Sequence, residues 1–176
     1  MSIVAKSVFR RGAEDGVWFG IYLSVLFVLS ILQIPFLGLL GLIMALAVPV
    51  YVFFVLRKGY IENGCFYTFS EMWTYGIILF LCGSLFMAST IIIYLNWINP
   101  SFIYDQCLLA IELYRQIGGP TGYEMASTLE KMVNNNMLPT PFTIASNLIT
   151  FSVFSGSILS IILSLIIRKT VKSKDI

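Results

Sequence analysis

The sequence predicts an all-α integral membrane protein, built as a four-helix bundle with an extracytoplasmic amphipathic helical hairpin between its third and fourth spans. Composition is the first reason, because 58% of the 176 residues are hydrophobic and 11% are charged, against roughly 45–50% and about 25% in soluble proteins. Charge placement is the second, since three long stretches carry no charged side chain: residues 16–56, 72–104 and 132–167. A charge at the bilayer centre costs about 2.5–3.5 kcal/mol, so such stretches are typical of membrane spans.

The first stretch is long enough for two spans, because one span needs about 20 residues. Gln33-Ile34-Pro35 predicts the turn between them, since proline lacks a backbone donor and disfavours helix at the residue before it. No small-residue cleavage motif follows the first span, which argues against a secretory signal peptide. Pro49 indicates a local kink inside the second span. We predict one membrane domain over residues 1–176, with spans at 17–32, 36–56, 75–98 and 144–167.

The basic residues predict how the bundle is oriented. Nine of the eleven flank the spans on one side, namely Lys6, Arg10, Arg11, Arg57, Lys58, Arg168, Lys169, Lys172 and Lys174. The other two, Arg115 and Lys131, lie between the third and fourth spans. By the positive-inside rule, both termini are expected in the cytoplasm and the segment between the third and fourth spans outside.

Residues 99–142 predict two short amphipathic helices outside the bilayer. Asn99-Pro100 is typical of a helix start, with asparagine as the N-cap and proline at the first helical position. Gly118-Gly119-Pro120 predicts the turn that ends this helix, and Thr121 with Glu124 has the spacing of a capping box for the next. Apolar residues recur on each helix at three- and four-residue spacing: Ile103, Cys107, Ala110, Ile111, Tyr114 and Ile117 on the first, and Met125, Ala126, Leu129, Met132 and Val133 on the second.

Three interpretations of this hairpin are open. Its apolar stripes rest on the outer ends of the spans or in the headgroup layer, which makes it a structural lid. Alternatively, it is a docking surface for another protein, with Glu112, Glu124 and Glu130 as the possible partner-docking face. A catalytic pair of acids is the least favoured interpretation, because solvated helix faces carry acids without any chemistry.

Catalytic, cofactor and metal motifs are absent from the sequence. It has no His, the commonest general base and metal ligand, and no GxGxxG, Walker, HExxH or GxSxG pattern. Cys65, Cys82 and Cys107 fall at three different depths of the predicted topology, which argues against a disulfide. We therefore expect a protein that is not an enzyme and has no catalytic, cofactor-binding or metal-binding residues. A net charge of +2 also argues against a nucleic-acid partner.

Small residues predict close packing between helices. In the fourth span Ser152, Gly156, Ser160 and Ser164 are spaced by four, so they share one helix face. Gly12, Gly16 and Gly20 repeat that spacing near the first span. The pattern leaves open whether the partner helix belongs to the same chain or to another subunit.

The predicted span ends carry aromatic and neutral polar residues. The aromatic side chains are expected to anchor at the headgroups: Trp18, Tyr22, Tyr51, Trp73, Tyr75, Tyr94 and Trp97. The polar side chains in or next to the spans are Gln33, Asn96 and Asn147. We expect these to form hydrogen bonds at the interface and not to line a permeation path.

Three short motifs carry a family resemblance. They are residues 69–76 (FSEMWTYG) leading into the third span, residues 98–102 (INPSF) leading out of it, and the Ser-rich last span running into Arg168-Lys169. With them the chain resembles the 4199 family of domains of unknown function, small four-span membrane proteins typical of the Bacteroidota. The resemblance implies four membrane helices in a bacterial inner membrane, and it brings no catalytic residues.

These observations favour a non-enzymatic inner-membrane protein, an accessory or scaffold subunit of a membrane complex that presents its hairpin to a partner. The expected partners are the lipid bilayer and another membrane or periplasmic protein, or a second copy of the chain. The alternative is a small transporter or channel component, which would have to oligomerise because four helices enclose little room for a polar path. An enzyme acting on lipid or peptidoglycan precursors is a third, less favoured reading.

Overall fold

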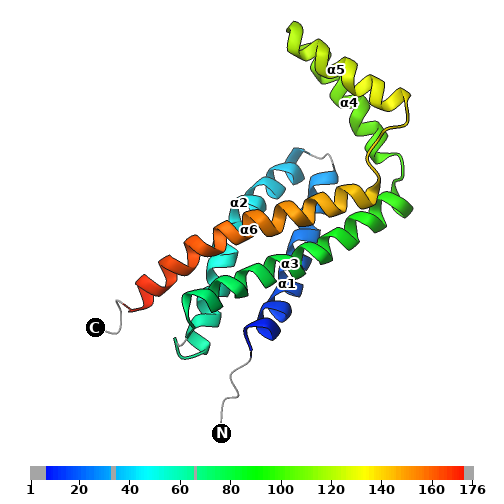
Figure 1. The fold of residues 1–176 in the computed structure, drawn as a ribbon. Coiled ribbons are helices and arrows are strands. Elements are labelled where there is room, and N and C mark those ends of the chain that lie inside the picture. The colour runs from blue at the N-terminus through cyan, green and yellow to red at the C-terminus, as the bar shows by residue number, and fades with distance from the viewer. Residues whose placement is uncertain (1–6, 33–34, 66, 173–176) are drawn as a thin grey trace. The chain divides into compact units, whose positions relative to one another are not determined.

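The computed structural model describes residues 7–32, 35–65 and 67–172, and every regular element among them is a helix (Figure 1). In chain order these are α1 (Val8–Ile31), α2 (Pro35–Glu62), α3 (Phe69–Ile93), the π-helix η1 (Tyr94–Ile98), α4 (Phe102–Ile117), α5 (Gly119–Asn134) and α6 (Pro141–Lys172). Four stretches are long and apolar enough to cross a membrane: Val8–Ile31, Phe36–Glu62, Phe69–Ile98 and Pro141–Thr170. The predicted all-helical class with four membrane-capable helices is therefore confirmed.

The long helices continue beyond the uncharged stretches into charged sequence. Ser7 is the N-cap of α1, and its hydroxyl accepts a hydrogen bond from the Arg10 amide at 3.4 Å. Helix α2 begins at Pro35, one residue before the predicted span, because proline suits the first position of a helix. Gln33 and Ile34 of the predicted turn lie outside the described residues. It runs through Pro49 and ends only at Glu62. Charged side chains limit the apolar part of a span but do not end a helix, so hydropathy alone sets these boundaries too short.

Specific capping motifs end α2 and begin α3. At the end of α2 the Cys65 amide donates to the Tyr60 carbonyl at 3.0 Å and the Gly64 amide donates to the Ile61 carbonyl at 2.9 Å. This is a Schellman motif, and Gly64 takes the positive φ of +66° that it requires. A capping box starts α3: the Glu71 carboxylate accepts from the Thr68 amide at 2.7 Å, and the Thr68 hydroxyl accepts from the Glu71 amide at 3.3 Å.

Two helix starts predicted for the outer segment are wrong. Asn99 and Pro100 are the first two positions of a turn, closed by the Phe102 amide on the Asn99 carbonyl at 3.2 Å, so α4 begins two residues later. Proline is favoured at that second position of a turn as well as at a helix start, which explains the ambiguity. The Thr121 box does not form, because Gly118 caps α5 and Pro120 already lies in its first turn.

The chain divides into two compact units. The first falls within Met1–Ser89 and Asn147–Ile176, and the second is Thr90–Ser146. The core of the first unit contains side chains from all four long helices, among them Phe19 of α1, Val52 of α2, Leu79 of α3 and Ile167 of α6, each fully buried. The Phe19 ring lies 5.6 Å from that of Tyr51 and 5.1 Å from that of Phe80, which links α1 to α2 and α3.

Close contact between α1 and α3 depends on the glycines spaced by four on α1. A Cβ atom added to Gly16 would lie 2.6 Å from the Cβ of Cys82, and one added to Gly20 would lie 2.5 Å from the Cβ of Phe86. Real Cβ atoms do not approach so closely, so side chains at these positions would push the two helices apart.

In the second unit, α4 and α5 form a hairpin that packs on itself (Figure 1). Gly118 and Gly119 form the turn with positive φ values of +68° and +76°. Ile111 and Ala126, from the two predicted apolar stripes, are buried, and most of the remaining stripe residues are half-buried. Arg115 of α4 pairs with Glu130 of α5. The apolar stripes of α4 and α5 thus largely cover each other.

Candidate functional site

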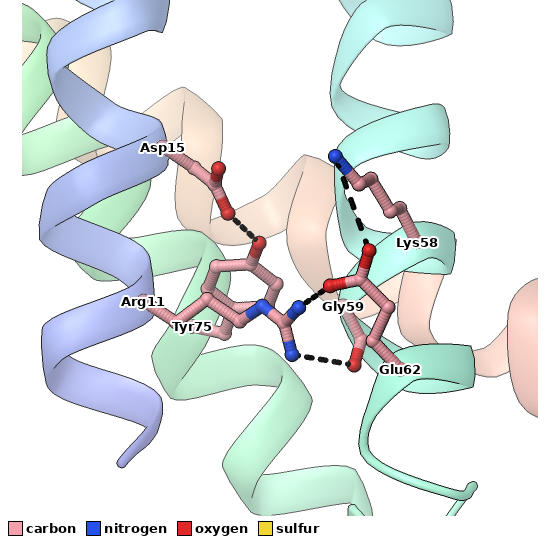
Figure 2. Close-up of polar contacts among 6 residues, drawn as sticks. All are labelled: Arg11, Asp15, Lys58, Gly59, Glu62 and Tyr75. Atoms are coloured by element: carbon pink, nitrogen blue, oxygen red, sulfur yellow. Dashed lines mark hydrogen bonds and ion pairs between the residues drawn. The ribbon is translucent and has the colours of Figure 1, made fainter. Parts of the chain in front are cut away.

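Charged residues from two helices meet a buried tyrosine from a third (Figure 2). We call this group the charged cluster; its members are Arg11 and Asp15 of α1, Lys58, Gly59 and Glu62 of α2, and Tyr75 of α3. The cluster forms because α1 begins before the uncharged stretch of residues 16–56 and α2 ends after it. The charged residues that flank this stretch therefore lie on helix faces that pack against each other.

Arg11 joins α1 to the last turn of α2. Its guanidinium donates to the Gly59 carbonyl at 3.2 Å and pairs with the Glu62 carboxylate. The last carbonyls of a helix carry a partial negative charge, so a cation there is favourable. The Arg11 side chain is 16% exposed, which makes this the most buried ion pair among the described residues.

Glu62 is shared between two cations. One carboxylate oxygen pairs with Arg11, and the other lies 3.9 Å from the Lys58 Nζ (Figure 2). The Lys58 side chain is 74% exposed, and long contacts between exposed charges contribute little. Glu62 is therefore held chiefly by Arg11, and Lys58 remains available to other groups.

Tyr75 provides the buried part of the charged cluster. Its ring is fully buried, and its hydroxyl donates a hydrogen bond to the Asp15 carboxylate. A Cβ atom on Gly59 would lie 2.5 Å from the Tyr75 ring, so only glycine at this position leaves room for the tyrosine. The prediction of Tyr75 as a headgroup anchor is therefore wrong, whereas Trp18 and Trp97 are exposed over 68% and 77% of their surface.

The charged cluster surrounds a small polar cavity of about 160 Å³, which Glu14 also lines. Its acids face Arg11 and Lys58, so the charges of the two signs nearly balance. Among the described residues, no three His, Cys, Asp or Glu side chains are grouped to hold a metal ion. Cys65, Cys82 and Cys107 are free thiols. The arrangement is suited to holding α1, α2 and α3 together.

The charge pattern of the sequence identified Arg11 only as one of the flanking basic residues and did not single out Asp15 or Glu62. One signal was present: Arg11 and Asp15 are four residues apart and adjoin the glycine row of α1. Residues beside a row of small side chains lie near a helix contact, so these two charges require partners there. Which groups of α2 and α3 supply them depends on the tertiary structure.

The predicted small-residue seam on α6 lies partly against α3. Ser160 and Ser164 are fully buried, and Ser160 lies against Gly76, where any added Cβ would collide with its hydroxyl. Gly156 lies under the ring of Phe80. Next to the seam, the Trp73 indole donates to the Ser157 hydroxyl at 3.0 Å. These contacts are all within one chain.

Ser152, the fourth seam residue, lines a cavity of about 230 Å³. All four long helices contribute to its walls, with apolar side chains such as Leu23, Val48, Met87 and Leu148. This cavity is almost entirely apolar, so it does not provide a polar path through the bundle.

The three acids proposed as a docking face are in different environments. Glu130 is committed to Arg115 within the hairpin. Glu112 of α4 and Glu124 of α5 are exposed. A second exposed apolar row joins Ile117 of the predicted stripe to Leu109 and Leu113, which were not anticipated; the three are spaced by four on α4 and are 67%, 52% and 56% exposed, respectively. We call these three residues the outer stripe.

Comparison with known proteins places the chain in a family without assigning it an activity. No curated protein and no solved structure matches it. The family described as Protein of unknown function (DUF4199) matches residues 14–169. Because this match runs from α1 through α6 and includes most of the charged cluster, this multi-pass membrane protein belongs to the DUF4199 family.

Proposed function

We propose that this protein is a non-enzymatic accessory or scaffold subunit of a bacterial inner-membrane complex, and that its α4–α5 hairpin is the surface that meets the partner. One observation carries the proposal. The hairpin covers most residues of its two predicted apolar stripes and still exposes the outer stripe of Leu109, Leu113 and Ile117. A passive linker needs no second apolar row.

The surroundings of the outer stripe resemble a protein interface. On a helix, Glu112 and Gln116 project beside Leu109 and Leu113, so apolar and polar side chains lie next to each other. Protein interfaces combine an apolar centre with a polar rim in this way. The orientation predicted from the basic residues would place the hairpin outside the cytoplasm, where a membrane or periplasmic protein is its accessible partner.

Site-specific photo-crosslinking in cells tests this proposal. A photoreactive amino acid at Leu113 of the full-length chain, which is 56% exposed, should yield a discrete adduct with a different protein. The same amino acid at Ile111, which is 7% exposed and faces into the hairpin, is the matched control and should yield none.

The alternatives predict other products at Leu113. Adducts only with a second copy of the chain would favour the small oligomeric transporter or channel component. Adducts only with lipid, or none at all, would favour a structural lid in the headgroup layer. Either result would contradict the accessory-subunit proposal.

A further inference from the structure

The end of α2 forms a basic hollow that is separate from the hairpin. It has a volume of about 320 Å³ and is lined by Arg57 and Lys58 together with Phe54, Ile61 and Glu62. Phe54 and Ile61 are 58% and 48% exposed. Two cations and two apolar side chains therefore border one depression at the end of a membrane-capable helix.

The charges in this hollow are unequally engaged. Glu62 is the one acid among its lining residues, and that carboxylate pairs with Arg11, which does not line the hollow. Lys58 lies 3.9 Å from Glu62 and remains 74% exposed. Among the described residues, no carboxylate lies within ion-pairing distance of Arg57. Arg57 is thus a positive charge that no described carboxylate neutralises, and Lys58 adds a second charge that is engaged only through the 3.9 Å contact with Glu62.

An apolar row runs along α2 to the hollow. Leu46, Val50 and Phe54 are spaced by four, so they share one helix face, and they are 72%, 54% and 58% exposed. Lys58 is the next residue in the same series. The face therefore changes from apolar to basic at the end of the helix, in the same order as an acyl chain and its headgroup.

From this juxtaposition we infer that the end of α2 is a binding site for an anionic phospholipid. The phosphate lies between Arg57 and Lys58, and an acyl chain follows Phe54, Val50 and Leu46. Guanidinium groups bind phosphate oxygens through paired hydrogen bonds, and lysine adds a point charge. A lipid with a net negative charge is preferred to a zwitterionic one, because its headgroup has no cation to be repelled by the two basic residues.

Arg11 has a positioning role in this site. By holding Glu62, it keeps that carboxylate from closing on Lys58 and from repelling the phosphate. Loss of Arg11 is therefore expected to weaken lipid binding although Arg11 does not line the hollow. Removing the Glu62 charge as well should restore the binding.

Native mass spectrometry of the full-length protein in detergent tests the inference. Dioleoyl phosphatidylglycerol is compared with dioleoyl phosphatidylcholine, which has the same acyl chains. We expect the parent to prefer the anionic lipid by about tenfold, and R57Q/K58Q to lose that preference. R168Q/K169Q removes the same amount of charge from exposed residues of α6, and this variant should keep the preference for the anionic lipid.

A competition experiment separates a lipid site from a site for free phosphate. Glycerol 3-phosphate at the same concentration as the lipid should not displace phosphatidylglycerol; effective displacement would show a site for free phosphate and overturn the lipid assignment. Equal loss in both double variants, or equal binding of both lipids by the parent, would also overturn it. R11Q should weaken the preference and R11Q/E62Q should recover it, and a failure to recover would refute the role assigned to Arg11.

Discussion

At the scale of single residues, the structure shows how a glycine makes room for a buried polar group. Gly59 lies within α2, where glycine lowers helix stability by about 1 kcal/mol relative to alanine. Its absent side chain admits the Tyr75 ring, and its carbonyl accepts from Arg11. Tyr75 can then reach Asp15 from a fully buried position.

Gly59→Ala should therefore destabilise the protein by about 1–3 kcal/mol, the usual cost of overpacking, despite the better helix propensity of alanine. Gly38→Ala is the matched control, because it is in the same helix and a Cβ there meets no atom within 4 Å. Thermal unfolding in detergent measures both. If the melting temperature of Gly59→Ala equalled or exceeded that of Gly38→Ala, the role given to Gly59 in the charged cluster would be contradicted.

At the scale of elements, the helices of the first unit are joined by faces of small residues. Gly16 and Gly20 of α1 lie against α3, and Ser160 of α6 lies against Gly76 of α3. The Ser160 hydroxyl donates to the Gly156 carbonyl of its own helix at 2.7 Å, so this polar group is satisfied without a partner on α3. The neighbouring Ser164 hydroxyl is also buried but has no hydrogen-bond partner among the described residues, so close approach of the backbones satisfies one serine of the seam and not the other.

Ser160→Leu should lower stability by about 1–3 kcal/mol, because it adds bulk where α3 and α6 are in contact. Ile162→Trp is the control on the exposed face, since Ile162 is 50% exposed. The melting temperature in detergent should fall for Ser160→Leu and change little for Ile162→Trp. The reverse order would show that the packed face has been misassigned.

The hairpin is an element whose charges divide into internal and external ones. Glu130 pairs with Arg115, so it stabilises the hairpin itself, whereas Glu112 and Glu124 are exposed. Glu112→Gln with Glu124→Gln should leave folding unchanged, because exposed charges contribute about 0–1 kcal/mol each. If a partner protein binds through these two charges, less of it should copurify with the double variant than with the parent at low salt. The difference between variant and parent should vanish at high salt, where the charges are screened. Equal recovery at low salt would exclude charge-guided docking.

At the scale of the whole molecule, the four membrane-capable helices found among the described residues are an even number, which agrees with termini on one side of the membrane. The basic residues predict that this side is the cytoplasm. The hairpin would then lie outside, and the turn between α2 and α3 inside. This arrangement is the basis for the choice of partner in the proposed function.

Thiol labelling of intact cells tests that orientation. Thr121→Cys, at an exposed position of α5, should react with a membrane-impermeant maleimide in a chain that lacks Cys107. Cys65, in the turn after α2, should react only after the inner membrane is permeabilised. Labelling of Cys65 alone in intact cells would reverse the orientation.

The sequence by itself determined the class of the protein, the four membrane-capable helices and the two helices of the hairpin. These properties depend on composition, charge spacing and helical periodicity, which are local and can be read along one chain. Even there, local signals misplaced the start of α4, because Pro100 suits a turn as well as a helix start.

Only the tertiary structure decided which residues meet. Arg11 and Glu62 are far apart in the sequence, and Tyr75 is an ordinary aromatic residue until Gly59 of α2 leaves room for its ring. Ser152 and Ser160 follow one four-residue pattern, yet one lines a cavity and the other packs on Gly76. A helical pattern specifies the face on which a residue lies but not what lies opposite, because that depends on how separate helices pack.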